Sequence, residues 1–298
     1  MSLTDTHCHL DLENFDHDRL AVLERAARAG VAHILIPGLN LPSSRSAVKL
    51  AESHPMLSAA IGVHPTEAAT WNNSSINELT ALAFGAFGAS GASVPSGTLE
   101  TSDTSEPSKI VAIGEIGLDY YWNSTPHELQ VKVLRYQLDL AAGLGLPVIL
   151  HMREDKDALQ DDCARDLLQI LESWVAGLRL GQNPLANRPG VLHSFSGSLE
   201  TARRALSLGF TIGVTGPVTY PNARTHQDIV AALPLECLLL ETDAPFQAPH
   251  PYRGKRNESS YVRLIADKIA LLHACTLEDV AKATSENAGR LFAWKEIV

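Results

Sequence analysis

Leu3-Thr4-Asp5-Thr6-His7-Cys8-His9, the first strand-like run and the residues after it, distinguishes two possible α/β folds. A doubly wound open sheet would carry a glycine-rich phosphate-binding turn after its first strand. This chain has an acidic residue and two histidines there instead. The first strand therefore favours a barrel over a dinucleotide-binding sheet.

Eight short runs rich in Val, Ile and Leu recur along the chain, and most are separated by a segment of helical character. Such runs are typical of parallel strands that are buried on both faces. The expected strands are residues 3–7, 32–37, 57–63, 109–115, 147–151, 190–194, 210–214 and 237–242. A strand followed by a helix eight times predicts an α/β fold, a (β/α)8 TIM barrel, with residues 1–298 in a single domain.

The helix expected after the fourth strand has its own start signal. In Thr125-Pro126-His127-Glu128 we expect Thr125 to be the N-cap and Glu128 to complete a capping box. A single buried stripe is predicted from the apolar residues that follow at intervals of three and four, namely Leu129, Val133, Tyr136, Leu140 and Leu144.

Residues 84–108 differ from their surroundings in composition. They are mostly Gly, Ala, Ser, Thr and acidic residues, as in a flexible insertion. The segment lies between the third expected helix and the fourth expected strand. We therefore expect it on the bottom face of the barrel, away from the active site.

The composition limits the possible partners. The chain has 298 residues and a net charge of 24 − 34 = −10 with neutral histidines, which argues against binding nucleic acid through the charge of the whole surface. A negatively charged substrate would need a basic loop or bound metal ions, and twelve histidines favour the metal ions. No obligatory protein partner is evident.

Three features predict a cytoplasmic protein without membrane contact. The longest apolar run, residues 140–150, is about half of the roughly 20 residues that span a membrane. The first residues contain neither a basic segment nor an apolar stretch typical of a signal peptide. The four cysteines lack the spacing of a disulfide framework.

Potential metal ligands stand at the ends of the expected strands. They are His7, His9, Glu115, His151, His193 and Asp243. The carboxyl ends of barrel strands converge on one mouth, and alternation along a strand puts both rings of a His-x-His on one face. Imidazoles and carboxylates bind Zn²⁺, Mn²⁺ or Fe²⁺, and Mg²⁺ tolerates a carboxylate-rich position. Six such ligands predict two divalent metal ions that share a bridging carboxylate.

Several longer motifs run along nearly the whole chain. They are residues 4–11 (TDTHCHLD), 62–65 (GVHP), 114–121 (GEIGLDYY), 146–151 (LPVILH), 193–197 (HSFSG), 214–220 (VTGPVTY), 241–245 (ETDAP) and 250–258 (HPYRGKRNE). In these motifs and their order the sequence resembles a known family, the TatD-type metal-dependent deoxyribonucleases. Ser194 stands where a cysteine is common and Ser259 where a proline is expected, but neither is a ligand position.

The resemblance implies a (β/α)8 hydrolase that cleaves DNA phosphodiesters, usually as a 3′-5′ exonuclease, with two divalent metal ions (Mg, Mn or Zn) per chain. It also implies how the ligands divide. One metal would be held by His7, His9, Glu115 and Asp243, and the other by Glu115, His151 and His193.

Other residues are candidates for catalysis and substrate binding. Two metals can activate a water molecule for in-line attack, and Asp243 is our candidate to orient that water and accept its proton. We expect His64 and Asp119 to contact the substrate or protonate the leaving group, or else to hydrogen-bond a ligand.

One basic cluster, Arg253, Lys255 and Arg256, follows the last strand. We expect it to rim the mouth and bind the DNA backbone, although a solvated loop would have the same composition. Tyr121 and Trp122 could stack on a base or simply pack within their loop.

Two alternative functions remain open. A related barrel hydrolase would act on another ester, lactone, amide or phosphotriester, but many of these use a carboxylated lysine at the end of strand four or five. Glu115 and His151 occupy those places here. A non-catalytic, metal-dependent nucleic-acid-binding protein would be expected to have lost a ligand.

Overall fold

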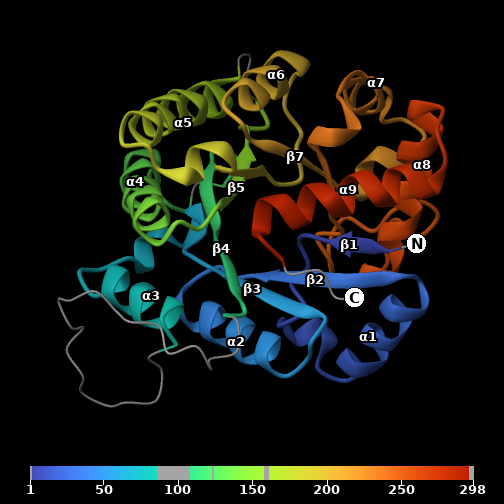
Figure 1. The fold of residues 1–298 in the computed structure, drawn as a ribbon, viewed down its shortest axis with the longest axis horizontal. Helices are drawn as coiled ribbons and strands as arrows, with labels where there is room; N and C mark the ends of the chain where they lie inside the picture. The colour runs from blue at the N-terminus through green and yellow to red at the C-terminus, as the bar shows by residue number, and fades with distance from the viewer. Residues whose placement is uncertain (1, 86–107, 123, 158–160, 295–298) are drawn as a thin grey trace.

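A computed structural model of the protein contains one parallel eight-stranded sheet, with strands in the order β1 to β8. The structure describes residues 2–85, 108–122, 124–157 and 161–294. The strands are β1 (Leu3–Asp5), β2 (Val31–Pro37), β3 (Leu57–Ile61), β4 (Ile110–Asp119), β5 (Val148–Arg153), β6 (Gly190–Leu192), β7 (Thr211–Val214) and β8 (Leu238–Leu240). The predicted barrel is confirmed, because every neighbouring pair from β1–β2 to β7–β8 is parallel (Figure 1).

The first and last strands meet just beyond their carboxyl ends. The backbone N–H of Thr6 donates to the carbonyl of Leu240 at 2.9 Å, and Cys8 forms a parallel bridge with Ala244. These contacts bring the residues after β1 next to those after β8, although more than 230 positions separate them in the chain.

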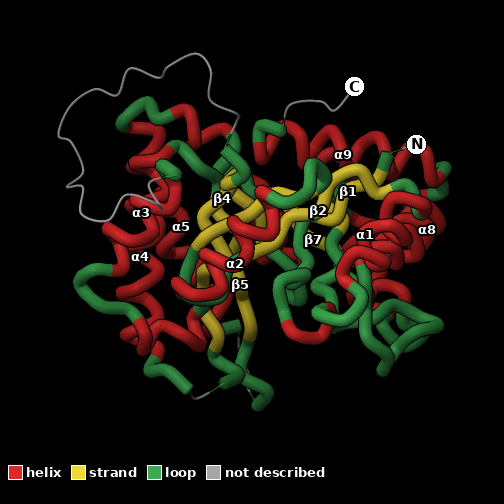
Figure 2. Tube along the Cα trace, turned by 90° about the horizontal axis from the view of Figure 1, so that it is seen from below, coloured by secondary structure: helices red, strands yellow, loops and turns green. Residues whose placement is uncertain are grey.

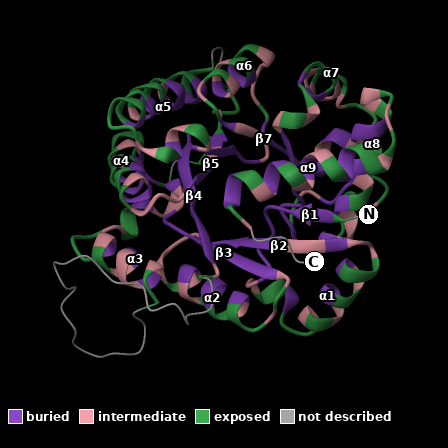
Figure 3. Cartoon of the chain, viewed as in Figure 1, coloured by how far each residue is buried: buried purple, intermediate pink, exposed green. Residues whose placement is uncertain are grey.

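The helices lie outside the strands (Figure 2). They are α1 (Arg19–Arg28), α2 (Leu41–Glu52), α3 (Ser75–Ala83), α4 (His127–Leu144), α5 (Asp162–Leu180), α6 (Leu199–Ser207), α7 (Arg224–Ala232), α8 (Val262–His273) and α9 (Leu277–Phe292). Short 3-10 turns are η1 (Glu13–Phe15), η2 (Pro65–Thr70), η3 (Pro184–Asn187), η4 (Gly216–Thr219), η5 (Leu235–Cys237) and η6 (Ser259–Tyr261). The strands are largely buried and the outer helix faces exposed, as the strand composition predicts (Figure 3).

The last helix, α9, covers the amino-terminal end of the barrel. Asn287 on α9 donates to the carbonyls of Leu235 and Leu238 at the start of β8. Arg188, just before β6, donates to the carbonyl of Leu291 at 2.7 Å. This end of the barrel is therefore closed by packing, which leaves the carboxyl end as the open one.

The start of α4 differs from the prediction. The helix begins at His127 with Pro126 as its N-cap, and no side chain caps it. The hydroxyl of Thr125 instead donates to the carbonyl of Thr66 at 2.9 Å, which ties this turn to the loop after β3. The predicted capping box is wrong because a tertiary partner takes the hydroxyl. Tyr136 is also misplaced in the predicted stripe, since it is 43% exposed and stacks on Trp71.

Two further predictions concern strand β4 and the insertion. β4 extends to Asp119, so Glu115 lies within the strand and the prediction that it ends the strand is wrong. The pairing of β4 with β5 shifts register between Ile113 and Ile116, around this glutamate.

Most of the predicted insertion 84–108 lies outside the described residues; its described flanks follow α3 and precede the amino end of β4. No described helix is long and apolar enough to cross a membrane.

Candidate metal centre

A cavity of about 1070 Å³ opens at the carboxyl ends of the strands. Five of the six predicted ligands line it, together with His64. The sixth, His7, is fully buried beneath the cavity. The convergence expected from the strand ends is therefore observed.

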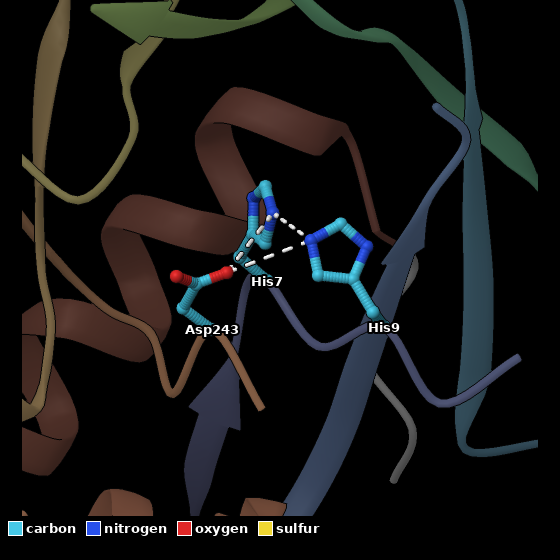
Figure 4. A group of neighbouring side chains, drawn as sticks. All are labelled: His7, His9 and Asp243. Atoms are coloured by element: carbon cyan, nitrogen blue, oxygen red, sulfur yellow. Dashed lines mark hydrogen bonds and ion pairs between the residues drawn. The ribbon is translucent and has the colours of Figure 1, made fainter. Parts of the chain in front are cut away.

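The first group of side chains follows β1 and β8 (Figure 4). The Nε2 atoms of His7 and His9 lie 3.2 Å apart, and Oδ1 of Asp243 lies 3.9 Å from the first and 3.5 Å from the second. Asp243 adopts a left-handed backbone conformation with φ of 55°, which turns its carboxylate into this group. Although burial raises the pKa of Asp243, its hydrogen bond with His9 and the nearby charge of His193 lower it to about 2.

Glu115 connects this group to a second one. Its Oε2 lies 3.2 Å from Nε2 of His7, while its Oε1 lies 2.8 Å from Nδ1 of His151 and 3.5 Å from Nε2 of His64. Each carboxylate oxygen therefore faces a different set of imidazoles. Burial alone would raise the pKa of Glu115, but the charges and hydrogen bonds of these histidines hold it well below its usual range.

His151 is held between two carboxylates. Its Nε2 lies 2.8 Å from Oδ2 of Asp119, opposite the contact of Nδ1 with Glu115. Burial lowers the pKa of His151, but hydrogen bonds with Asp119 and Glu115 outweigh burial and raise it to about 9. Asp119 has a 1% exposed side chain and also accepts the backbone N–H of Trp122. Asp119 is therefore placed to hydrogen-bond His151, which is one of the roles expected for it from the sequence.

His64 belongs to the second group as well. The backbone N–H of Thr66 donates to its Nδ1 at 3.2 Å, so the neutral ring carries its proton on Nε2, which faces Glu115. Burial and the neighbouring charge of His151 lower the pKa of His64. The ring is therefore suited to donate a hydrogen bond into the cavity.

His193 lies with His7 rather than with His151. The two rings stack with centroids 3.4 Å apart, and Nε2 of His193 is 3.8 Å from Oδ1 of Asp243. The reason is Glu241, whose Oε2 accepts from Nδ1 of His193 at 2.8 Å and draws the ring toward the side of the barrel where β1 and β8 meet. This grouping differs from the one implied by the resemblance, in which His193 and His151 share a metal.

Three positioning residues were not identified from the sequence. Glu241, fully buried, holds His193 and accepts the backbone N–H of Ser194. Asp5 accepts both the hydroxyl and the backbone N–H of Thr242, next to Asp243, and burial raises the pKa of Asp5 to about 7. The third is Gln247, which donates to Oδ2 of Asp243 at 2.6 Å. A signal was available for two of them, because Asp5 and Glu241 each precede a predicted ligand by two residues.

The basic cluster after β8 is divided by its contacts. Arg256 forms two bonds of 2.7 Å with the carboxylate of Asp18, which ties the loop to the start of α1. Arg253 lies over the ring of Tyr220 and Lys255 over that of Tyr252. Within the described ranges, none of the three basic residues lines the cavity.

The residues of the centre suit divalent cations. Three overlapping groups place ligand atoms within 4.8 Å of one another: His7, His9 and Asp243; His7, Glu115 and His193; and His64, Glu115 and His151. The buried Nδ1 atoms of His7 and His9 have no hydrogen-bond partner in the described part of the chain, and their Nε2 atoms face each other. Nitrogen and oxygen lone pairs that converge in this way fit a metal ion better than they fit one another.

Comparison with known proteins identifies the relatives of this chain. The family model described as TatD related DNase matches residues 4–293. The metal-dependent hydrolase YabD of Bacillus subtilis is 37% identical over 293 residues, which cover 97% of this chain and 98% of YabD. The 3′-5′ ssDNA/RNA exonuclease TatD of a Rahnella species is 33% identical over 294 residues, 96% of each chain. The crystal structure of YjjV, a TatD homologue from Escherichia coli K12, has a TM-score of 0.81 and 33% identity, with 98% of each chain covered.

Proposed function

The chain belongs to the TatD-related DNase family, and on that premise we propose that it hydrolyses phosphodiester bonds of single-stranded nucleic acid from the 3′ end, with two divalent metal ions. The observation that carries the proposal is the placement of Glu115. A carboxylate whose two oxygens face two separate sets of imidazoles has the geometry that a bridging ligand needs.

The proposed ligands follow from the groups around Glu115. His7, His9, His193 and Asp243 lie on its Oε2 side, and His151 lies on its Oε1 side. When bound, Mg²⁺, Mn²⁺ or Zn²⁺ would offset the phosphate charge and lower the pKa of the attacking water, to about 7 in the case of Zn²⁺.

The protein side chains would then move the protons. Asp243, fixed by Gln247 through Oδ2, presents Oδ1 to the centre and would accept the proton of the attacking water. His64 would donate from Nε2 to the leaving oxygen or to a phosphate oxygen. The carboxylate of Asp119 would keep the ring of His151 in place.

The alternative barrel hydrolases receive less support. Among the described residues, no lysine lines the cavity, and Glu115 occupies the bridging position in β4.

We also propose a cytoplasmic location, because all four cysteines are unpaired and two are buried.

A substrate panel tests the proposal. Purified protein is incubated with a 5′-labelled single-stranded DNA, a lactone and a phosphotriester, each with Mg²⁺, Mn²⁺, Zn²⁺ or EDTA. We expect a ladder of DNA products shortened from the 3′ end with a metal, and none with EDTA. Turnover of the lactone or phosphotriester without any DNA cleavage would overturn the proposal.

A further inference from the structure

Two large aromatic side chains in the wall of the cavity are unusually exposed. Trp122 and Phe246 are each 52% exposed, and both line the cavity. Exposing an aromatic ring to water has a free-energy cost, which burial or a ligand removes. The described part of the chain leaves about half of each residue's surface uncovered, so both side chains are available to a bound molecule.

The two rings stand on opposite sides of the metal centre. Trp122 follows β4 and Phe246 follows β8, and these strands are four places apart in an eight-stranded barrel. The backbone N–H of Trp122 donates to Asp119 at 3.0 Å, and that of Phe246 donates to the carbonyl of Asp243 at 2.8 Å. The backbone of Trp122 is thus bonded to Asp119, which contacts His151, and the ring of Phe246 lies 6.1 Å from the ring of His9.

A cation lies on the same wall as Trp122. The guanidinium of Arg153 is 4.0 Å from the centre of the Tyr121 ring and 5.6 Å from that of Trp122. Among the described residues, no carboxylate forms an ion pair with Arg153, whereas Arg256 pairs with Asp18. Arg153 also lines the cavity, so a cationic residue lies beside the space that a substrate would occupy.

We infer that Trp122 and Phe246 each stack a nucleobase, one on either side of the scissile phosphate, and that Arg153 contacts the backbone phosphate beside Trp122. The inference rests on the proposed function and specifies which residues bind the substrate. Bases in a duplex already stack on their neighbours, so only an unpaired strand can offer its bases to two separate rings. The pair of rings would therefore select for single strands without selecting for sequence.

The test compares two substrates of equal length and charge. One is a single-stranded thymidine oligonucleotide, and the other has the same backbone with abasic sites in its last three positions. We expect Trp122→Ala and Phe246→Ala to lower kcat/KM for the oligonucleotide by about 5- to 150-fold each, the range for loss of one stacked base. On the abasic substrate, which the parent should cleave slowly, the same variants should match the parent.

Conservative and control variants exclude a structural explanation. Trp122→Phe and Phe246→Tyr keep a ring and should retain most activity. Tyr136→Ala removes an exposed ring that stacks on Trp71 outside the cavity, and it should cleave both substrates like the parent. Arg153→Gln should reduce the slope of log K against log salt by about 0.7, as expected when one phosphate of a single strand is no longer neutralised.

Two outcomes would overturn the inference: oligonucleotide cleavage at the parent rate by both alanine variants, or equal reductions on both substrates. A parent protein that cleaves no nucleic acid with any metal would instead overturn the proposed function.

Discussion

His33 and His7 lie at opposite ends of the same barrel, and their surroundings differ. His33, near the amino end of β2, stacks on Trp294 with ring centroids 4.7 Å apart, and burial lowers its pKa. His7, after β1, lies within 4 Å of the carboxylates of Glu115 and Asp243, and its ring stacks on that of His193. Residue type therefore does not define a site; convergence of several ligands does.

The two ends also differ in what stabilises them. At the amino end, α9 contributes Ala288, Leu291 and Phe292 to an apolar cluster with Leu35 and Leu239. At the carboxyl end, buried carboxylates and imidazoles replace apolar packing, at a cost in desolvation free energy. The comparison predicts that substitutions at the carboxyl end change metal binding and activity, while substitutions at the amino end change at most stability.

The largest effect is expected for Glu115→Gln. The amide keeps the size of the side chain but removes its charge and turns an NH₂ group toward one set of imidazoles. We expect a folded protein that loses most of one metal, with nuclease activity reduced by at least about a hundredfold. Elemental analysis and the oligonucleotide assay measure both effects.

His33→Ala is the matched control from the opposite end of the barrel. It should keep the full metal content and activity of the parent. If Glu115→Gln keeps both metals and the activity of the parent, Glu115 does not bridge two metals and is a structural carboxylate of the barrel.

The next effect concerns Glu241, which in the described part of the chain contacts one proposed ligand, His193. Glu241→Gln should weaken metal affinity by about 10- to 100-fold, because the carboxylate orients the ring and raises its basicity. Gly213→Ala should act in the same direction, since an added Cβ would overlap the carboxylate of Glu241. Metal titration, with thermal melting to confirm folding, checks both variants; parent affinity in both would show that Glu241 has no positioning role.

Much of this centre could be predicted from the sequence, because the place of a residue along a strand determines which way its side chain points. His7 and His9 share a face through the period of two, and parallel strands bring their carboxyl ends together. Asp5 and Glu241 each stand two residues before a predicted ligand, so those carboxylates could have been assigned to the site. The sequence does not show whether such a neighbour ligates a metal or orients a ligand.

Contacts between distant segments could not be predicted. Arg256 pairs with Asp18, 238 positions away, and nothing local indicates that partner. The hydroxyl of Thr125 bonds to the carbonyl of Thr66 instead of capping its helix for the same reason. The length of β4 beyond Glu115 was missed because Gly114 and Gly117 interrupt the apolar run.

A smaller effect separates the members of the basic cluster. Arg253→Ala with Lys255→Ala should lower the salt dependence of DNA binding by about 0.7 in slope for each phosphate that these side chains neutralise, without changing metal content. Arg256→Ala should instead cost about 1 kcal/mol or less of stability, since its ion pair with Asp18 is partly exposed. Binding titrations over a salt series and thermal melts distinguish the two; an unchanged slope in the double variant would make this loop only a solvated surface.

The smallest effect is expected at the amino end. Replacing residues 86–107 with a short Gly-Ser linker should leave turnover nearly unchanged, because the flanking residues lie at the amino end of β4, opposite the cavity. Steady-state kinetics of the variant check this. A large drop in activity in a variant that melts like the parent would show that the segment reaches the active site.

The most direct test of the central claim is anomalous diffraction from crystals of the protein loaded with Mn²⁺. Two peaks about 3.5–4 Å apart are expected, one beside each carboxylate oxygen of Glu115, and none near His33. A single peak, or two peaks that do not share Glu115, would contradict the two-metal centre.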